Sequence, residues 1–103
     1  MNKYSYRIRP QADADLDNHA QVIAGDNLEV ALRLYDRAQE TYEMLCEMPH
    51  MGVLHNSPKP ELVAVRYLPI KDFLRYLVFY RITDRTIDII RVLHSRMDRD
   101  GWL

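Results

Sequence analysis

Glycine and cysteine are scarce in this chain. Only three glycines occur in 103 residues and none stands in a G-x-G-x-x-G or Walker spacing, which excludes a glycine-rich phosphate loop. The single cysteine, Cys46, cannot form an internal disulfide and suits a reducing compartment. It is expected to be a small buried residue of a helix. His50 and His55 have no cysteine near them, so neither a metal nor a cofactor is expected.

Long hydrophobic runs are also missing. The longest apolar runs fall far short of the ~20 residues that a membrane-spanning helix needs. The opening residues, Met-Asn-Lys-Tyr-Ser-Tyr-Arg, lack the apolar centre of a signal peptide. Hydrophobic residues make up 48% of the chain and charged residues 28%, a balance typical of globular proteins. We therefore expect a single cytoplasmic domain over residues 1–103, with no membrane association.

Basic residues are few in the first half of the chain. Residues 10–50 contain nine acids and two bases, whereas residues 63–99 contain eight bases and four acids. Eleven of the fourteen bases are arginine, which favours bidentate contacts with carboxylate or phosphate. The separation of acids and bases along the chain indicates a cationic surface that meets an anionic partner. The alternative is that acidic helices and basic strands are both ordinary solvated surface.

The first half of the chain has the pattern of one strand and two helices. Lys3–Arg9 alternates apolar and polar residues, as a half-buried strand does. Helical spacing follows over Gln11–Ala24 and again over Leu28–Met48, where Asn27 or the aspartate before it caps the second helix. Pro49 ends that helix. The short link between the helices predicts an antiparallel helical hairpin.

The second half of the chain has the pattern of strands. Pro49–Glu61 holds three of the five prolines and is predicted to be an irregular loop. A strand is predicted over Leu62–Leu68, ended by Pro69, followed by a β-hairpin formed by Phe73–Ile82 and Thr86–Ser95. The fold class is therefore α+β in the order β-αα-βββ, with the helical hairpin packed on one face of a mostly antiparallel four-stranded sheet. Residues 96–103 are polar enough to form a flexible tail.

The two faces of the first hairpin strand differ. Because side chains alternate along a strand, one face is wholly apolar or aromatic and consists of Leu74, Tyr76, Val78, Tyr80 and Ile82. The opposite face interleaves arginines with Phe73, Leu77 and Phe79. We expect the apolar face to pack against the helices. The second face is expected to be half-buried and to serve as a docking surface.

The candidate partner-binding residues are arginines. Arg75 and Arg81 share a strand face, whereas the register of Arg66 on the neighbouring strand cannot be derived. Such a patch pairs with a partner's acids as readily as with phosphate, so protein and nucleic acid remain open as partners. The full candidate set is Arg66, Arg75, Arg81, Arg91 and Arg96.

His94 is the candidate for acid–base chemistry. Imidazole titrates near neutrality, and Arg96 follows two residues later. Together they could cleave RNA, with the imidazole moving a 2′-OH or leaving-group proton and the guanidinium holding the phosphate. The alternative is a structural histidine at a strand end, hydrogen-bonded to backbone.

A series of short motifs runs along nearly the whole chain. In order these are Arg9-Pro-x-Ala12, Asp15-Leu16, Ile23-Ala24, Asp26-Asn27, Pro49-x-Met51-Gly52, Val65-Arg66-x-Leu68-Pro69, Tyr76-Leu-Val-Phe-Tyr80-Arg81 and Ile89-Ile-Arg-Val-Leu-His94. The series resembles the ParE toxins, which belong to the ParE/RelE superfamily of type II toxin–antitoxin modules. Leu28 departs from the pattern, since many members have proline after the residue equivalent to Asn27.

The resemblance implies a small bacterial toxin that causes growth arrest and plasmid stabilisation. Its partner would be a ParD-like antitoxin whose disordered C-terminal segment folds into apolar grooves on the helical hairpin and sheet. The two proteins would form a hetero-oligomer, or the toxin a dimer. ParE-type members poison DNA gyrase, whereas RelE-type members cleave mRNA on the ribosome, often with a tyrosine near the C-terminus.

No tyrosine follows Tyr80 here, and only three lysines are present. The resemblance therefore favours a gyrase inhibitor that acts by protein–protein binding without catalysis, and meets nucleic acid only through its antitoxin or target. One alternative is a RelE-like endoribonuclease, with His94 as acid or base and Arg66, Arg75 and Arg96 on the phosphate. Another is an inactive toxin fold that only binds its partner.

Overall fold

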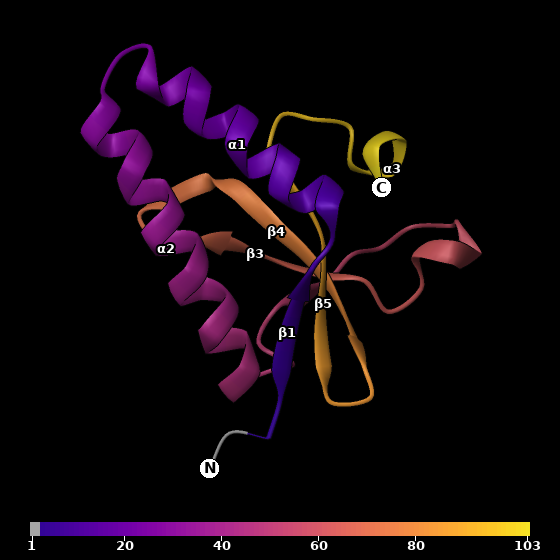
Figure 1. Ribbon diagram of the computed structural model, residues 1–103. Helices are drawn as coiled ribbons and strands as arrows, with labels where there is room; N and C mark the ends of the chain where they lie inside the picture. The colour runs from indigo at the N-terminus through magenta and orange to yellow at the C-terminus, as the bar shows by residue number, and fades with distance from the viewer. Residues whose placement is uncertain (1–2) are drawn as a thin grey trace.

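In the computed structural model, which describes residues 3–103, a helical hairpin lies on one face of a five-stranded sheet (Figure 1). The elements in chain order are β1 (Ser5–Ile8), α1 (Pro10–Ala24), α2 (Leu28–Glu47), β2 (Val53–Leu54), the 3-10 turn η1 (Pro60–Leu62), β3 (Arg66–Ile70), β4 (Phe73–Thr83), β5 (Thr86–His94) and α3 (Arg99–Trp102). The predicted α+β class and the helical hairpin are confirmed.

The predicted four-stranded, mostly antiparallel sheet is wrong in detail. The strand order is β1-β5-β4-β3-β2, and β1 runs parallel to β5 while the other pairs are antiparallel. The extra strand, β2, lies inside the segment predicted to be an irregular loop. Two residues are too few to show alternation, so only pairing with β3 reveals this strand.

The third strand begins and ends later than predicted. Leu62 belongs to η1, and β3 continues through Pro69 to Ile70. β2 pairs only with Arg66 and Tyr67, so among residues 3–103 no strand pairs with the outer edge of β3 at Pro69. A proline lacks the N–H of a ladder but is tolerated at such an edge. The register with β4 shifts directly after it.

Helix ends and an apolar interface fix the hairpin on the sheet. Pro10 stands in the first turn of α1, and the Asn27 side chain accepts a hydrogen bond from the Val30 N–H at the start of α2. The core between helices and sheet is formed by Ala12, Leu16, Ala20, Ala31, Leu34, Ala38, Tyr42, Leu45, Cys46, Leu68, Ile70, Val78, Tyr80, Ile87, Ile89 and Val92. On the predicted apolar face of β4, Tyr76, Val78, Tyr80 and Ile82 pack against this core as expected. The prediction is wrong for Leu74, which is 70% exposed, and Phe73, expected on the opposite face, packs against this core instead.

The opposite face of the sheet has a small core of its own. Phe79 is fully buried and Leu77 is 6% exposed, and both pack with Leu62, Val65 and Leu93. The central part of this face is therefore covered, contrary to the expectation of a half-buried docking surface. The cover consists of η1 with its flanking loop and the last residues of the chain. Within residues 96–103, where the sequence allowed a flexible tail, α3 forms and Leu103 packs on this core.

No helix in the described part of the chain is both long and apolar enough to cross a membrane.

Candidate functional site

Three rings meet at the open end of the β4–β5 ladder, away from the hairpin turn. Tyr76 of β4 pairs directly with His94 of β5, and their ring centroids lie 5.2 Å apart in an edge-to-face arrangement. His19 of α1 packs on the same tyrosine at 4.8 Å. The His19 Nε2–H donates to the Val92 carbonyl at 2.8 Å, because a carbonyl oxygen can only accept. We refer to these three residues as the ring cluster.

The hydrogen bond of His94 decides what its imidazole can do. Its Nδ1 accepts the Arg96 backbone N–H at 3.1 Å, so the proton of the neutral ring is on Nε2. Burial lowers the pKa of His94, and the nearby Arg96, His19 and Arg75 lower it further. At neutral pH the ring therefore has no free lone pair to accept a proton from a substrate. This geometry favours the alternative of a structural histidine at a strand end.

Two of the predicted arginines lie beside the ring cluster. Arg75 and Arg96 are exposed, and the Ser95 N–H donates to the Arg75 carbonyl at 2.7 Å. In the described part of the chain, no hydrogen bond or ion pair involves either guanidinium. His94, Arg75 and Arg96 are therefore brought together as the sequence proposed.

Arg66 lies elsewhere. It pairs with Tyr80 in the middle of β4, and its guanidinium donates to the carbonyls of Gly52 at 2.8 Å and His50 at 3.3 Å. The fourth member of the hypothetical nuclease set is therefore engaged in holding the loop after α2.

The other predicted arginines, Arg81 and Arg91, make contacts within the chain. Arg81 donates to the carbonyls of Glu61 at 2.7 Å and Val63 at 3.0 Å, which fixes the loop around η1. Arg91 forms a bidentate pair with Asp15 of α1 at 2.7 and 2.8 Å and also donates to the Trp102 carbonyl. The pKa of Arg91 is raised, chiefly by its hydrogen bond to Asp15.

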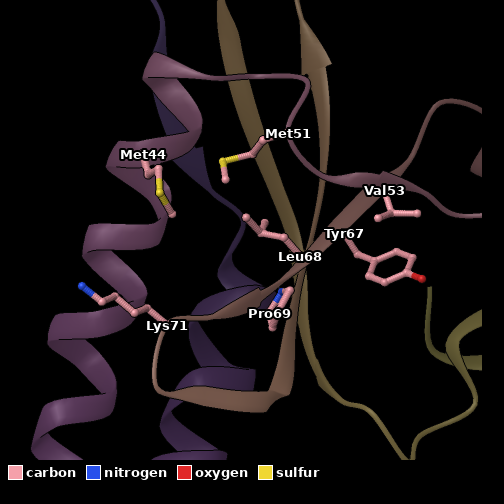
Figure 2. Close-up of a pocket in the computed structure, with 7 residues that line it drawn as sticks. All are labelled: Met44, Met51, Val53, Tyr67, Leu68, Pro69 and Lys71. Atoms are coloured by element: carbon pink, nitrogen blue, oxygen red, sulfur yellow. The ribbon is translucent and has the colours of Figure 1, made fainter.

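An apolar pocket of about 370 Å³ opens at the edge of the sheet, between α2 and β3. In Figure 2, Met44 projects from α2 and Met51 from the loop that follows it, both toward Leu68 of β3. Val53, Tyr67, Pro69 and Lys71 complete the lining. We call this the sheet-edge pocket. Val53 in this lining is 60% exposed. Beside the pocket, the outer edge of β3 is unpaired from Leu68 onward in the described chain.

A buried tyrosine positions the loop that carries Met51. The Tyr80 hydroxyl donates to the Pro49 carbonyl at 2.7 Å and accepts the Gly52 N–H at 2.9 Å. A Cβ on Gly52 would lie 2.6 Å from that hydroxyl oxygen, so only glycine fits there. Burial raises the pKa of Tyr80, which keeps its hydroxyl protonated.

A second apolar groove, about 190 Å³ in volume, lies between the helices near the tip of their hairpin. Small residues of α1, Ala20 and Ala24, form one wall, while Leu28, Leu32 and Tyr35 of α2 form the other. Leu28 is 64% exposed and Leu32 57%. Both grooves present apolar side chains to solvent.

The sequence reasoning missed Tyr76 and His19 as neighbours of His94. The sequence places Tyr76 only on an apolar strand face, and nothing in the spacing of α1 indicates that His19 reaches β4. The register of β4 with β5 and the crossing of α1 over them bring these rings together. Among residues 3–103, no group of three or more His, Cys, Asp or Glu side chains is arranged to hold a metal ion.

One comparison with known proteins identifies a family, and another identifies a similar fold. Residues 6–99 match the family described as "ParE toxin of type II toxin-antitoxin system, parDE". The structure titled "Chromosomal ParDE TA system from P. aeruginosa" is similar with a TM-score of 0.71 and 22% sequence identity, covering 91% of this chain and 98% of that one. At this identity the likeness concerns the fold. Among curated proteins, none matches the chain.

Proposed function

The chain belongs to the ParE toxin family of type II toxin–antitoxin systems, and on that basis we propose that it inhibits DNA gyrase by protein–protein binding and is neutralised by a ParD-like antitoxin. The observation that supports binding over catalysis is the hydrogen bond from the Arg96 N–H to His94 Nδ1. It occupies the lone pair that a general base would need. Arg66, which a nuclease would use on the phosphate, is bonded to backbone carbonyls instead.

The second candidate function is a RelE-like endoribonuclease. It is supported by the grouping of His94 with Arg75, Arg96 and Tyr76 at one end of the sheet. This function requires the turn after β5 to open, since His94 can accept a proton only after it loses the Arg96 N–H. A ParE fold that binds its partners without poisoning a target is the remaining possibility.

The sheet-edge pocket supports the antitoxin half of the proposal. An extended segment of a partner can pair with the free edge of β3 while one apolar side chain enters the space between Met44 and Met51. Partners that fold on binding use such grooves because they gain apolar burial at each anchor. The second apolar groove, between the two helices at Leu28 and Leu32, can accept another apolar side chain of the partner.

Two parallel assays test the proposal. The purified chain is expected to block DNA supercoiling by gyrase and to leave ribosome-bound mRNA intact. The His94→Asn variant should inhibit gyrase as the unchanged chain does, because asparagine retains an acceptor for the Arg96 N–H. Cleaved mRNA with unaffected gyrase would contradict the proposal and favour the endoribonuclease. If neither assay responds while an antitoxin still binds, the inactive binding module is favoured.

A further inference from the structure

Two methionines line the sheet-edge pocket, one from α2 and one from the loop that follows it. Met44 and Met51 project into the same space beside Leu68 (Figure 2). Met51 is 39% exposed, so solvent reaches this side chain. Of the seven residues in the lining, only Lys71 bears a charge. The two thioethers therefore border a space that offers almost no polar partners.

The backbone on either side of Met51 is fixed by hydrogen bonds. The Gly52 N–H donates to the Tyr80 hydroxyl at 2.9 Å, and that hydroxyl donates to the Pro49 carbonyl at 2.7 Å. The Arg66 guanidinium also donates to the Gly52 carbonyl at 2.8 Å. The loop therefore cannot move away from the pocket to make room for an altered side chain at position 51 without breaking these bonds.

The other described methionines are placed differently. Met44, also in the lining, is half-buried. Met48 is 58% exposed but is not part of the lining. Met97 packs on the small core of the opposite sheet face, and its sulfur accepts the His94 N–H at 3.3 Å. A thioether is oxidised where an oxidant reaches its sulfur, so Met51 is the methionine that combines such access with a place in the pocket.

We propose that Met51 is an oxidation site through which hydrogen peroxide prevents the antitoxin from binding this chain. The inference rests on the proposed docking of an antitoxin at the sheet-edge pocket. The sulfur lone pair attacks one peroxide oxygen, and an S–O bond forms as the O–O bond breaks. The departing hydroxide takes the proton of the transferred oxygen and leaves as water. Sulfur loses two electrons and becomes a sulfoxide, and the peroxide is reduced.

A sulfoxide changes what the pocket can accept. Its oxygen is a hydrogen-bond acceptor, and burial against an apolar side chain of the partner leaves that oxygen without a donor. The charged donor of the lining, Lys71, points away from Met51 (Figure 2). If the oxidised side chain turns to solvent instead, the pocket loses the wall that faces Met44. Either arrangement reduces the apolar burial of a docked segment, so its affinity falls.

Peroxide treatment of the purified chain, followed by calorimetric titration with a ParD-like antitoxin, tests the inference. Peptide mass spectrometry sets a dose at which Met48 and Met51 each gain one oxygen while Met97 gains none, and circular dichroism confirms that the chain stays folded. The oxidised chain is expected to bind the antitoxin about tenfold more weakly. A methionine sulfoxide reductase, which returns the sulfoxide to the thioether, should restore the affinity.

Two leucine variants separate the methionines. Met51→Leu keeps an apolar side chain of similar size, so it should bind the antitoxin before peroxide treatment and keep its affinity afterwards. Met48→Leu is the matched control, because it removes a more exposed methionine that lies outside the lining. It should lose affinity on treatment as the unchanged chain does. Equal losses in the two variants would overturn the inference, as would a Met51 that stays unmodified while Met48 is oxidised.

Met44→Glu, measured without peroxide, separates this inference from the proposal on which it rests. If that substitution weakens antitoxin binding and oxidation does not, the antitoxin docks at the pocket and the oxidation site is wrong. If neither the substitution nor peroxide changes the affinity, the proposed docking at the pocket is wrong as well.

Discussion

Arginine has two different roles at the scale of single residues. Arg81 and Arg91 each satisfy several acceptors inside the fold, while Arg75 and Arg96 remain exposed beside His94. All four are arginines on or next to strands, so residue type alone cannot separate them. The difference comes from the acceptors near each guanidinium. Arg81 reaches loop carbonyls and Arg91 a buried carboxylate, whereas Arg75 and Arg96 face solvent.

The Asp15–Arg91 pair is expected to contribute strongly to stability. The side chains are 8% and 13% exposed, and Asp15 also accepts the Val92 N–H at 3.0 Å. Asp15→Ala leaves a mostly buried guanidinium and a strand N–H without their acceptor, which should lower the free energy of unfolding by about 3 kcal/mol. Urea denaturation measures this as a lower midpoint with an unchanged slope.

Asp36→Ala serves as the control for that measurement. This residue is an exposed acid on α2, and its loss should change stability by no more than about 0.5 kcal/mol. Equal midpoints for the two variants would show that the Asp15–Arg91 pair does not stabilise the fold.

His94 should make stability depend on pH. Its pKa in the folded chain is lowered by burial and by Arg96, His19 and Arg75, whereas in the unfolded chain it is about 6.5. The unfolded state therefore binds the proton more readily, so the contribution of neutral His94 is complete above about pH 6.5 and is lost as the pH falls toward the folded pKa. Protonation also removes the acceptor for the Arg96 N–H.

Urea midpoints at about pH 7.5 and about pH 5.5 test this, a range that brackets the ordinary histidine pKa. His94→Asn keeps an acceptor but cannot titrate, so it should lose less stability than the unchanged chain between these values. His50 and His55 are the same in both proteins and lie at the loop after α2, away from His94, so their contributions cancel in the difference. Identical losses would mean that His94 does not couple to folding.

At the scale of elements, the helices follow their local signals and the short elements do not. Helix α2 begins after Asn27 and ends within one residue of the predicted end. β2 and α3 contain only two and four residues. Such short segments have no period of their own and form because another element binds them. β2 pairs with β3, and Arg91 contacts the carbonyl of Trp102 in α3.

The cap of α2 should be worth a measurable part of the stability. The Asn27 side chain accepts the Val30 N–H at 3.1 Å. Asn27→Ala is expected to lower the free energy of unfolding by about 1 kcal/mol, because that N–H then has no partner inside the helix. Asn18→Ala, an exposed position within α1, is the control and should be neutral or slightly stabilising, since alanine favours helix. A larger loss at position 18 than at 27 would refute the capping role.

At the scale of the whole molecule, other parts of the chain cover the two faces of the sheet but leave one of its edges open. The helices cover one face, while η1 and the C-terminal residues cover the centre of the other. The edge at β3 remains open beside an apolar pocket. An exposed edge next to apolar side chains invites pairing with another chain, as expected of a toxin that is neutralised by a partner.

A charge in the sheet-edge pocket should disturb that pairing. Met44→Glu introduces a carboxylate into an apolar lining and is expected to weaken antitoxin binding by about tenfold or more, because the charge loses its water in the complex. Calorimetric titration with a ParD-like antitoxin measures the effect. Gln39→Glu makes the same charge change at an exposed position of α2 and should bind as before. Equal affinities for both variants would place the antitoxin elsewhere.

The sequence by itself determined the α+β class, the helical hairpin and most of the apolar face of β4, although it left the cap open between Asp26 and Asn27 and misplaced Leu74. Each rests on interactions between residues close in the chain, or on a period of 3.6 or 2 that burial imposes on one element. Residue order also indicated the ParE family, and the family match over residues 6–99 confirms it.

Only the tertiary structure decided which strands are neighbours, that β1 runs parallel to β5, and which arginines are free. It also brought His19, Tyr76 and His94 together from three elements and directed the Arg96 N–H to the Nδ1 of His94. Pairing partners and strand direction depend on contacts between segments far apart in the chain, for which no local pattern exists. These contacts in turn determine the protonation state of a side chain and the groups it can bind.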